Sequence, residues 1–283
     1  MATFNNFATL SYNGGTTNSN TVTGEILDTL SSTKIAVMDD YTAKDDVTYV
    51  ITLLNSSNAP LNGVTITDDL GGYLFNGATV YPLAYTVGSV RLYINGVLQP
   101  SPAATAGPPL VLSGINIPAG GNAIVIYEAE VTTYAPLAAD DTITNTAVIT
   151  ATGLVTPVTV SAVITTEDRA DLTISKSVSP TVVSDNGQLT YTFVIENHGN
   201  TPAIATDNVV LTDTFDPILD PITVSLNGVT WTEGVEYTYD VATGLFTTTS
   251  GQITVPAATY TQAADGTWSV TPGTTTLTVT GTV

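Results

Sequence analysis

Apolar and polar residues alternate in short runs along most of the chain, and Asn-Gly, Gly-Gly or proline separates the runs. Alternation over about four to eight residues between turn signals predicts half-buried antiparallel strands. We expect tight hairpin turns at Asn95-Gly96 and Asn227-Gly228. No apolar stripe of helical period lasts beyond about ten residues, so we expect no helices. The clearest runs are residues 47–52, 123–131, 189–195 and 276–279.

Two segments of the chain align without gaps and reveal a repeat. Lys34 lies 15 positions before Tyr49 (49 − 34), and Lys176 lies 15 positions before Tyr191 (191 − 176). Further matches pair residues 64–68 with 209–213, 94–97 with 226–229, and 123–131 with 275–283. A long repeat built from short strands predicts an all-β chain of two tandem Ig-like β-sandwich modules. The predicted bounds are residues 1–30 for an N-terminal extension, 31–168 for module 1 and 169–283 for module 2.

Composition narrows the functional classes. The 283 residues include 25 Asp or Glu and only 5 Lys or Arg, which gives a formal net charge of −20. Such a chain would be repelled by a phosphate backbone, so we expect no nucleic-acid partner. The absence of cysteine excludes disulfides, thiolate zinc sites and thiol nucleophiles. Since no run approaches roughly 18 apolar residues, we expect no membrane partner, and the first residues show no signal peptide.

The residues around the second lysine resemble a known family. Asp-Leu-Thr-Ile-Ser-Lys-Ser-Val-Ser-Pro at 171–180, Leu-Thr-Tyr at 189–191 and Leu-Thr-Asp-Thr at 211–214 are similar to the bacterial "conserved repeat" domain, the domain of unknown function numbered eleven. Residues 144–150 resemble its closing strand. The resemblance implies Ig-like sandwiches of the kind strung along bacterial surface proteins. An acidic chain of two such modules also resembles the clostridial spore-appendage ribbon proteins, which implies an extracellular place on a cell or spore surface.

The two copies of the repeat are cut at different points. Module 1 continues past Val131 with two more strand-like segments, residues 142–151 and 158–165, and the second copy stops at Val283 without them. We therefore expect module 2 to lack its closing hairpin. A counterpart of that hairpin lies at the start of the chain. Residues 6–11 match 145–150, and residues 21–23 with Ile26 and Leu27 resemble 159–161 with Val163 and Ile164.

An incomplete sandwich exposes an unpaired strand edge, which invites the addition of a strand. Donor-strand complementation fills such a gap with an extended segment of another chain. We expect residues 1–30 to close module 2 of a neighbouring copy, with Phe4, Asn6, Ala8 and Leu10 facing its core. The contact joins two different surfaces, so it propagates as an open filament unless the rotation closes a ring. Two alternatives stay open: the N-terminal strand folds back onto its own module 2, or it packs as an edge strand of module 1.

In each module, three polar residues are in phase with the apolar residues of their strands, so we expect them to face the core. They are Lys34, Asp68 and Asn145 in module 1, and Lys176 and Asp213 in module 2 together with Asn6 of the neighbour. An unpaired charge in such a place would be very costly. A lysine desolvated among apolar side chains loses its proton more readily and becomes a nucleophile. A carboxylic acid in the same surroundings keeps its proton more readily and can polarise an amide.

This layout resembles the self-crosslinking Ig-like domains of Gram-positive adhesins and pili. In them a lysine attacks an asparagine amide, expels ammonia and leaves an isopeptide bond. The resemblance implies a Lys34–Asn145 bond assisted by Asp68 within module 1. Between subunits it implies a Lys176–Asn6 bond assisted by Asp213. The alternative is a hydrogen-bonded Lys–Asp pair, with the asparagine capping a strand.

The other candidate residues favour simpler interpretations, and no cofactor or metal is expected. His198 lies at a turn without a nucleophile or second ligand, as a solvated loop residue would. Paired acids such as Asp39-Asp40 can bind Ca²⁺, but the chain has no Asp-x-Asp-x-Asp-Gly loop. Trp231 and Trp268 can line a groove for surface glycans, although aromatic residues of sandwiches mostly pack in the core.

We therefore expect a structural subunit that assembles with itself, head to tail, into an extracellular fibre or a spore or cell-surface appendage. The rival interpretation is a binding protein, either an adhesin or a surface-layer stalk whose modules present loops to a ligand. An enzyme is not expected, because the sequence offers no nucleophile–base pair and no metal cluster beyond the self-crosslinking residues.

Overall fold

The computed structural model describes residues 2–26 and 29–283. Its elements are strands, with one 3-10 turn, η1 (Ala205–Asp207), in the described ranges, so the all-β prediction is confirmed. Within the same ranges no helix has the length and apolar character needed to cross a membrane. Met1 and residues 27–28 of the predicted donor extension, including Leu27, lie outside the described residues.

The chain divides into two compact units. Unit 1 comprises Met1–Asp39, Lys44–Thr132 and Ile143–Ile164, and unit 2 comprises Asp40–Ala43, Thr133–Thr142 and Thr165–Val283. Each unit holds most strands of one copy of the repeat. Two short segments from within the first copy, Asp40–Ala43 and Thr133–Thr142, are grouped with unit 2. The module bounds expected from the sequence stay a prediction.

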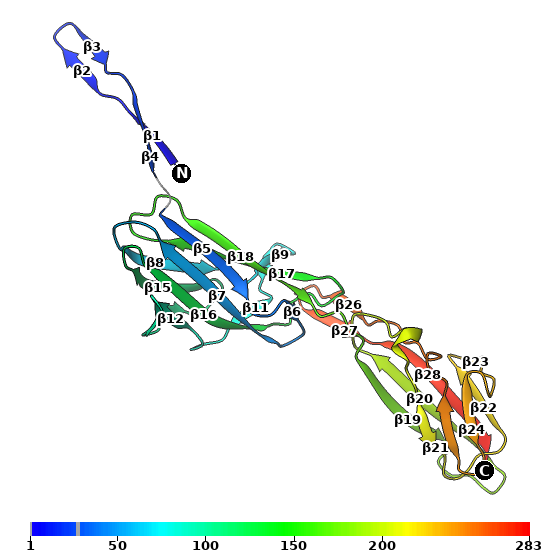
Figure 1. Ribbon diagram of the computed structural model, residues 1–283. Coiled ribbons are helices and arrows are strands. Elements are labelled where there is room, and N and C mark those ends of the chain that lie inside the picture. Colours follow the sequence, from blue (N-terminus) through cyan, green and yellow to red (C-terminus); the bar gives the residue numbers. More distant parts are fainter. Residues whose placement is uncertain (1, 27–28) are drawn as a thin grey trace. The chain divides into compact units, whose positions relative to one another are not determined.

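The first copy of the repeat forms two six-stranded sheets that are antiparallel apart from one parallel pair, β18 with β6 (Figure 1). One sheet runs in the order β13 (Val97–Gln99), β12 (Arg91–Ile94), β16 (Asn122–Val131), β7 (Asp46–Asn55) and β5 (Leu30–Ala36), and β11 (Leu83–Tyr85) pairs with β16. The other runs β14 (Ala103–Thr105), β15 (Leu110–Ile117), β8 (Leu61–Asp68), β17 (Thr142–Thr150), β18 (Val158–Thr166) and β6 (Asp40–Tyr41). A short ladder joins β9 (Tyr73–Phe75) and β10 (Ala78–Val80).

Alternation in the sequence becomes alternation in burial. Along β7, Val47, Tyr49, Ile51 and Leu53 are buried, and the residues between them are more exposed. The Asn-Gly turns form where expected, because both residues of each turn adopt positive φ, for example 49° at Asn95. They close the hairpins β12–β13 and, in module 2, β22–β23.

The second copy repeats one sheet but carries a smaller second sheet. The order β19 (Leu172–Ser179), β20 (Gln188–Asn197), β28 (Gly273–Thr282), β22 (Ile222–Leu226) and β23 (Val229–Thr230) matches β5-β7-β16-β12-β13. The second sheet holds β21 (Thr212–Thr214), β25 (Leu245–Thr248) and β24 (Tyr237–Asp240). A separate ladder joins β26 (Thr259–Gln262) and β27 (Trp268–Thr271).

The two copies differ at one edge of the second sheet. In module 1, β8 pairs with β15 on one side and with β17 on the other. In module 2, β21 pairs with β25, and its other edge carries no strand among the described residues. Counterparts of β17 and β18 are therefore absent from the part of module 2 that the structure describes.

The first strands of the chain form a hairpin of their own. β1 (Ala2–Asn6) pairs with β4 (Val22–Ile26), and β2 (Thr9–Tyr12) pairs with β3 (Gly15–Asn18) (Figure 1). Ala8 and Ser19 join the two ladders through a backbone hydrogen bond of 2.8 Å. All the ladders that these strands form lie within residues 2–26, the N-terminal hairpin. Within the described residues these strands therefore do not pair as an edge strand of module 1, and the alternative of a strand folded back onto module 2 stays open.

Candidate functional site

Lys34 lies inside module 1, as strand phase predicts. It alternates with exposed residues along β5 and shares the inner face with Leu30. Its Nζ donates a hydrogen bond of 2.7 Å to Oδ2 of Asp68, the last residue of β8, and both side chains are fully buried. The two residues therefore form an ion-paired contact across the sandwich, out of reach of solvent.

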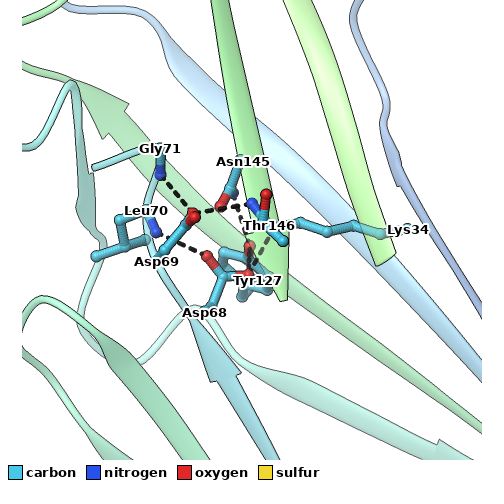
Figure 2. Close-up of polar contacts among 8 residues, drawn as sticks. All are labelled: Lys34, Asp68, Asp69, Leu70, Gly71, Tyr127, Asn145 and Thr146. Atoms are coloured by element: carbon cyan, nitrogen blue, oxygen red, sulfur yellow. Dashed lines mark hydrogen bonds and ion pairs between the residues drawn. The ribbon is translucent and has the colours of Figure 1, made fainter. Parts of the chain in front are cut away.

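Asp68 is the centre of the polar cluster in module 1 (Figure 2). Besides Lys34, its Oδ2 accepts a hydrogen bond of 2.6 Å from the hydroxyl of Tyr127 on β16. Its Oδ1 accepts one of 3.0 Å from the backbone N–H of Leu70, which has a positive φ of 53°. The carboxylate thus bonds to the turn after β8 as well as to two side chains from the facing sheet.

Asn145 reaches the same cluster from β17. Its Nδ2 donates a hydrogen bond of 3.1 Å to the hydroxyl of Tyr127, while its Oδ1 is buried without a hydrogen-bond partner. The next residue, Thr146, fixes the strand beside β8, because its N–H donates to Asp69 Oδ1 at 2.8 Å and its carbonyl accepts from Asp69 N–H at 2.9 Å. The position of the Asn145 amide is therefore set by the pairing of β17 with β8.

Burial controls the protonation of these groups. It lowers the pKa of Lys34, against the opposing effect of the Asp68 carboxylate, so the amine gives up a proton more easily than a lysine in water. It raises the pKa of Tyr127, and the neighbouring Asp68 carboxylate raises it further. The pKa of Tyr49, whose ring stacks on Tyr127 at 5.4 Å, is also raised by burial. Both phenols therefore keep their protons near neutral pH.

The cluster has the parts needed for amide exchange. It holds a desolvated amine, a carboxylate within hydrogen-bond distance that can take the amine's proton, and a buried carboxamide that can act as acyl donor. The structure thus brings together Lys34, Asp68 and Asn145, which the sequence singled out. The roles expected of them stay a proposal.

Module 2 presents the same Lys–Asp pair in an open setting. Lys176 Nζ lies 2.5 Å from Asp213 Oδ2, but the lysine side chain is 40% exposed and the aspartate 19%. The ammonium also lies over the rings of Tyr191, Phe193 and Phe215, at 4.4, 5.5 and 5.6 Å from their centroids. Such cation–π contacts hold the ammonium against the aromatic side chains of the module.

The apolar face around Lys176 lacks the cover that its counterpart has. Leu172, Ile174 and Val178 share its side of β19 and are 36%, 58% and 36% exposed. Leu30, the counterpart of Leu172 in module 1, is only 5% exposed. The face of β19 is therefore exposed where Leu30 and Lys34 of β5 are buried, and the edge of β21 that corresponds to the β17 edge of β8 is free among the described residues.

The expected donor residues lie on the N-terminal hairpin. Asn6 is exposed at the end of β1, and Ala8 is exposed between β1 and β2. The large side chains Phe4 and Leu10 are 50% and 64% exposed.

Two site residues were missed by the sequence reasoning. Tyr127 links Asp68 to Asn145, and Tyr49 places a buried hydroxyl without a hydrogen-bond partner beside the asparagine. Both are in phase with the buried residues of their strands, so a polar-tipped aromatic at an inward position was the available signal. A search limited to charges and amides could not use it.

The other candidate residues lie outside this cluster. His198 is a half-exposed turn residue whose Nε2 lies 3.6 Å from Glu196. Within the described ranges no group of three or more His, Asp or Glu residues is placed to hold a metal ion.

Removing the carboxylate should affect the two modules unequally. In module 1, Asp68→Ala leaves the buried Lys34 unpaired, and we expect a loss of about 3–5 kcal/mol in the free energy of unfolding. In module 2, Asp213→Ala breaks a partly exposed pair in the subunit and should cost about 1 kcal/mol or less. Urea unfolding of the two full-length variants measures both values. Equal losses would contradict the difference in burial.

Comparisons with known proteins give distant structural similarities. No family model and no curated protein matches the chain. It is similar to the major pilin BcpA of Bacillus cereus (13% identity, TM-score 0.37, 96% of this chain and 73% of that one). It is also similar to the pilus backbone RrgB of Streptococcus pneumoniae (12%, 0.35, 86% and 55%) and to a family 123 glycoside hydrolase of Clostridium perfringens (11%, 0.32, 49% and 27%). At these scores the likeness carries no argument about function, and the resemblance to the conserved repeat domain stays a prediction.

Proposed function

We propose that the protein is a structural subunit that polymerises by donor-strand complementation into a fibre on the surface of a cell or spore. One observation carries the proposal. The free edge of β21 corresponds to the edge of β8 that pairs with β17, the face of β19 is exposed where Leu30 and Lys34 of β5 are buried, and the N-terminal hairpin resembles β17 and β18 in sequence. A second copy of the chain thus supplies what module 2 lacks.

Module 1 serves as the template for the register. There Ala147 pairs with Asp68 and Val148 with Thr67. Because residue 6 corresponds to 145 and residue 213 to 68, Ala8 of one copy would pair with Asp213 of the next, and Thr9 with Thr212. In this register residues 4–10 would extend as one continuous strand on docking, and Phe4, Asn6, Ala8 and Leu10 would then all face the core of module 2.

Docking would also complete the second polar cluster. In the template, the asparagine amide lies beside the Lys–Asp pair. Asn6 of the incoming hairpin would occupy this place beside Lys176 and Asp213 and bury both. Attack of Lys176 Nζ on Asn6 Cγ, with loss of ammonia, would then join neighbouring subunits by an isopeptide bond. The same reaction between Lys34 and Asn145 would lock each module 1.

Assembly of this kind has a simple physical logic. The contact is heterologous, so every subunit offers a hairpin at one place and an acceptor edge at another, and the chain of subunits has no intrinsic end. Strand pairing contributes the backbone hydrogen bonds, and the apolar residues of the hairpin cover the exposed side of β19. The net charge of −20 keeps the unassembled subunit soluble.

Deletion of residues 1–12 tests the proposal. The shortened chain keeps both modules but loses β1 and β2, so we expect no filaments by negative-stain microscopy at concentrations where the full chain forms them. A peptide of residues 1–26 added to the full chain should shorten its filaments, because it caps acceptor edges. Filaments that persist after the deletion would refute donor-strand assembly. A monomer at high concentration that binds glycans would instead support the adhesin interpretation.

A further inference from the structure

Module 1 contains an unbroken path of hydrogen bonds from the amine to the amide. Lys34 Nζ bonds to Asp68 Oδ2 at 2.7 Å, the Tyr127 hydroxyl bonds to the same oxygen at 2.6 Å, and Asn145 Nδ2 bonds to the hydroxyl at 3.1 Å (Figure 2). The nitrogen at one end is the nucleophile of the proposed bond, and the nitrogen at the other end is its leaving group. The path thus connects the atom that must lose protons with the atom that must gain one.

We propose that Tyr127 is a catalytic proton relay for the Lys34–Asn145 bond. The inference rests on the proposed function, because it assigns a residue to the crosslinking step. The phenol would give its proton to Asn145 Nδ2 as the carbon–nitrogen bond breaks and would be reprotonated by Asp68. Neither an external acid nor water is then needed in this fully buried site.

The protons balance along this path. Lys34 first passes one proton to the Asp68 carboxylate, and its free amine attacks Asn145 Cγ. In the tetrahedral intermediate Nδ2 is no longer conjugated, so its lone pair accepts the proton of Tyr127. The proton on Asp68 moves to the phenolate oxygen, and Asp68 takes the second proton of Nζ. The Cγ–Nδ2 bond breaks, ammonia leaves, and the products are a neutral amide and a protonated Asp68.

The direction of the hydrogen bonds agrees with this sequence of steps. At rest, Nδ2 donates to the phenol oxygen and the phenol donates to the carboxylate. Once Nδ2 becomes basic, its lone pair turns toward the phenol, and the phenol proton turns from Asp68 to Nδ2. The protonated Asp68 then donates to the phenol oxygen. Burial keeps the phenol protonated at neutral pH and makes it a weaker acid, so it gives up its proton only as Asp68 reprotonates it.

Module 2 lacks this phenol. Val279 occupies the repeat position of Tyr127, and Phe215, in place of Leu70, stacks on Tyr191 at 5.1 Å. Phe215 thus stacks on the repeat counterpart of Tyr49, as Tyr127 stacks on Tyr49 itself. The Lys176–Asn6 bond would therefore form without the relay and more slowly. Each subunit would lock its first module before it is joined to its neighbour.

Tyr127→Phe tests the relay, with Tyr41→Phe as the control. Each removes one buried tyrosine hydroxyl, but the Tyr41 hydroxyl donates to the backbone carbonyl of Pro136 and lies off the path. Full-length chains that also carry Lys176→Arg, which blocks the intersubunit bond, are made by cell-free synthesis. Intact-mass spectrometry then follows the loss of one ammonia with time, and thermal unfolding confirms that the variants fold.

We expect Tyr127→Phe to slow the loss of ammonia roughly 100-fold or more, the usual contribution of a general acid, and Tyr41→Phe to change it little. If the Tyr127→Phe chain lost ammonia as fast as the chain that keeps Tyr127, the relay would be overturned while the crosslink stands. Equal slowing by both substitutions would also overturn it, since the loss of any buried hydroxyl would then explain the effect. Failure of the Lys176→Arg background itself to lose ammonia would overturn the crosslink and the relay together.

Discussion

Filaments of the Lys176→Arg variant should form but fall apart into monomers on boiling in SDS, whereas the unsubstituted protein should give a ladder of covalent oligomers. Arginine keeps the positive charge beside Asp213, so docking of the neighbour's hairpin is retained. Its guanidinium stays protonated and cannot attack an amide carbon. The variant therefore separates the covalent step from assembly. Negative-stain microscopy detects the filaments, and SDS gel electrophoresis of the same preparations detects the covalent bond.

The chain offers matched controls for this result. Lys44 is exposed, and Lys44→Arg should leave the ladder unchanged. Asn6→Ala should remove the ladder like Lys176→Arg, whereas Asn5→Ala, one position out of phase, should keep it. A ladder that survives both Lys176→Arg and Asn6→Ala would refute the intersubunit isopeptide bond. A ladder lost in Lys44→Arg would place the bond elsewhere.

Most of the fold could be predicted because strand patterns are local. Alternation along residues 47–52 sets which side chains face inward, and β7 has this phase. The Asn-Gly turns require positive φ and therefore mark their hairpins without knowledge of the rest of the chain. The repeat then carries these local assignments from one module to the other.

The chemistry of the site was predicted in part, for a physical reason. Charged residues in phase with apolar ones are rare, so Lys34 and Asp68 stand out in the sequence. Tyr127 does not, because an inward tyrosine is ordinary in a sandwich core. Its role depends on the 2.6 Å contact with Asp68, which forms across two sheets and has no local signature.

The difference between the two clusters also needed the structure. Lys34 and Lys176 occupy the same repeat position, yet one side chain is fully buried and the other 40% exposed. What separates them is the presence of β17 beside β8, a partner distant in sequence. The exposure of the Lys176–Asp213 pair thus goes with the absence of a β17 counterpart beside β21. In the proposed assembly, burial of this pair by the neighbour's hairpin would start the formation of the isopeptide bond.

The proposed register can be fixed with a pair of cysteines in a chain that has none. Thr9→Cys with Thr212→Cys should link neighbouring subunits, because Cα atoms of paired residues in an antiparallel ladder lie about 5.5 Å apart, within the range of a disulfide. We expect a ladder on non-reducing gels, in the Lys176→Arg background, that collapses to monomer on reduction. Both threonines are exposed in the subunit, so the substitutions leave its cores intact.

Thr9→Cys with Thr247→Cys is the matched control. Thr247 pairs with Thr212 from β25, so it lies one strand further from the incoming hairpin, at roughly twice the spacing between neighbouring strands. A disulfide cannot span that distance, and this variant should give no ladder. Linkage through residue 247 instead of 212 would show that the hairpin docks elsewhere. Linkage through residue 212 alone would place Ala8 beside Asp213, and therefore Asn6 beside Lys176. A slip of one residue in the pairing would instead turn the asparagine away from the core.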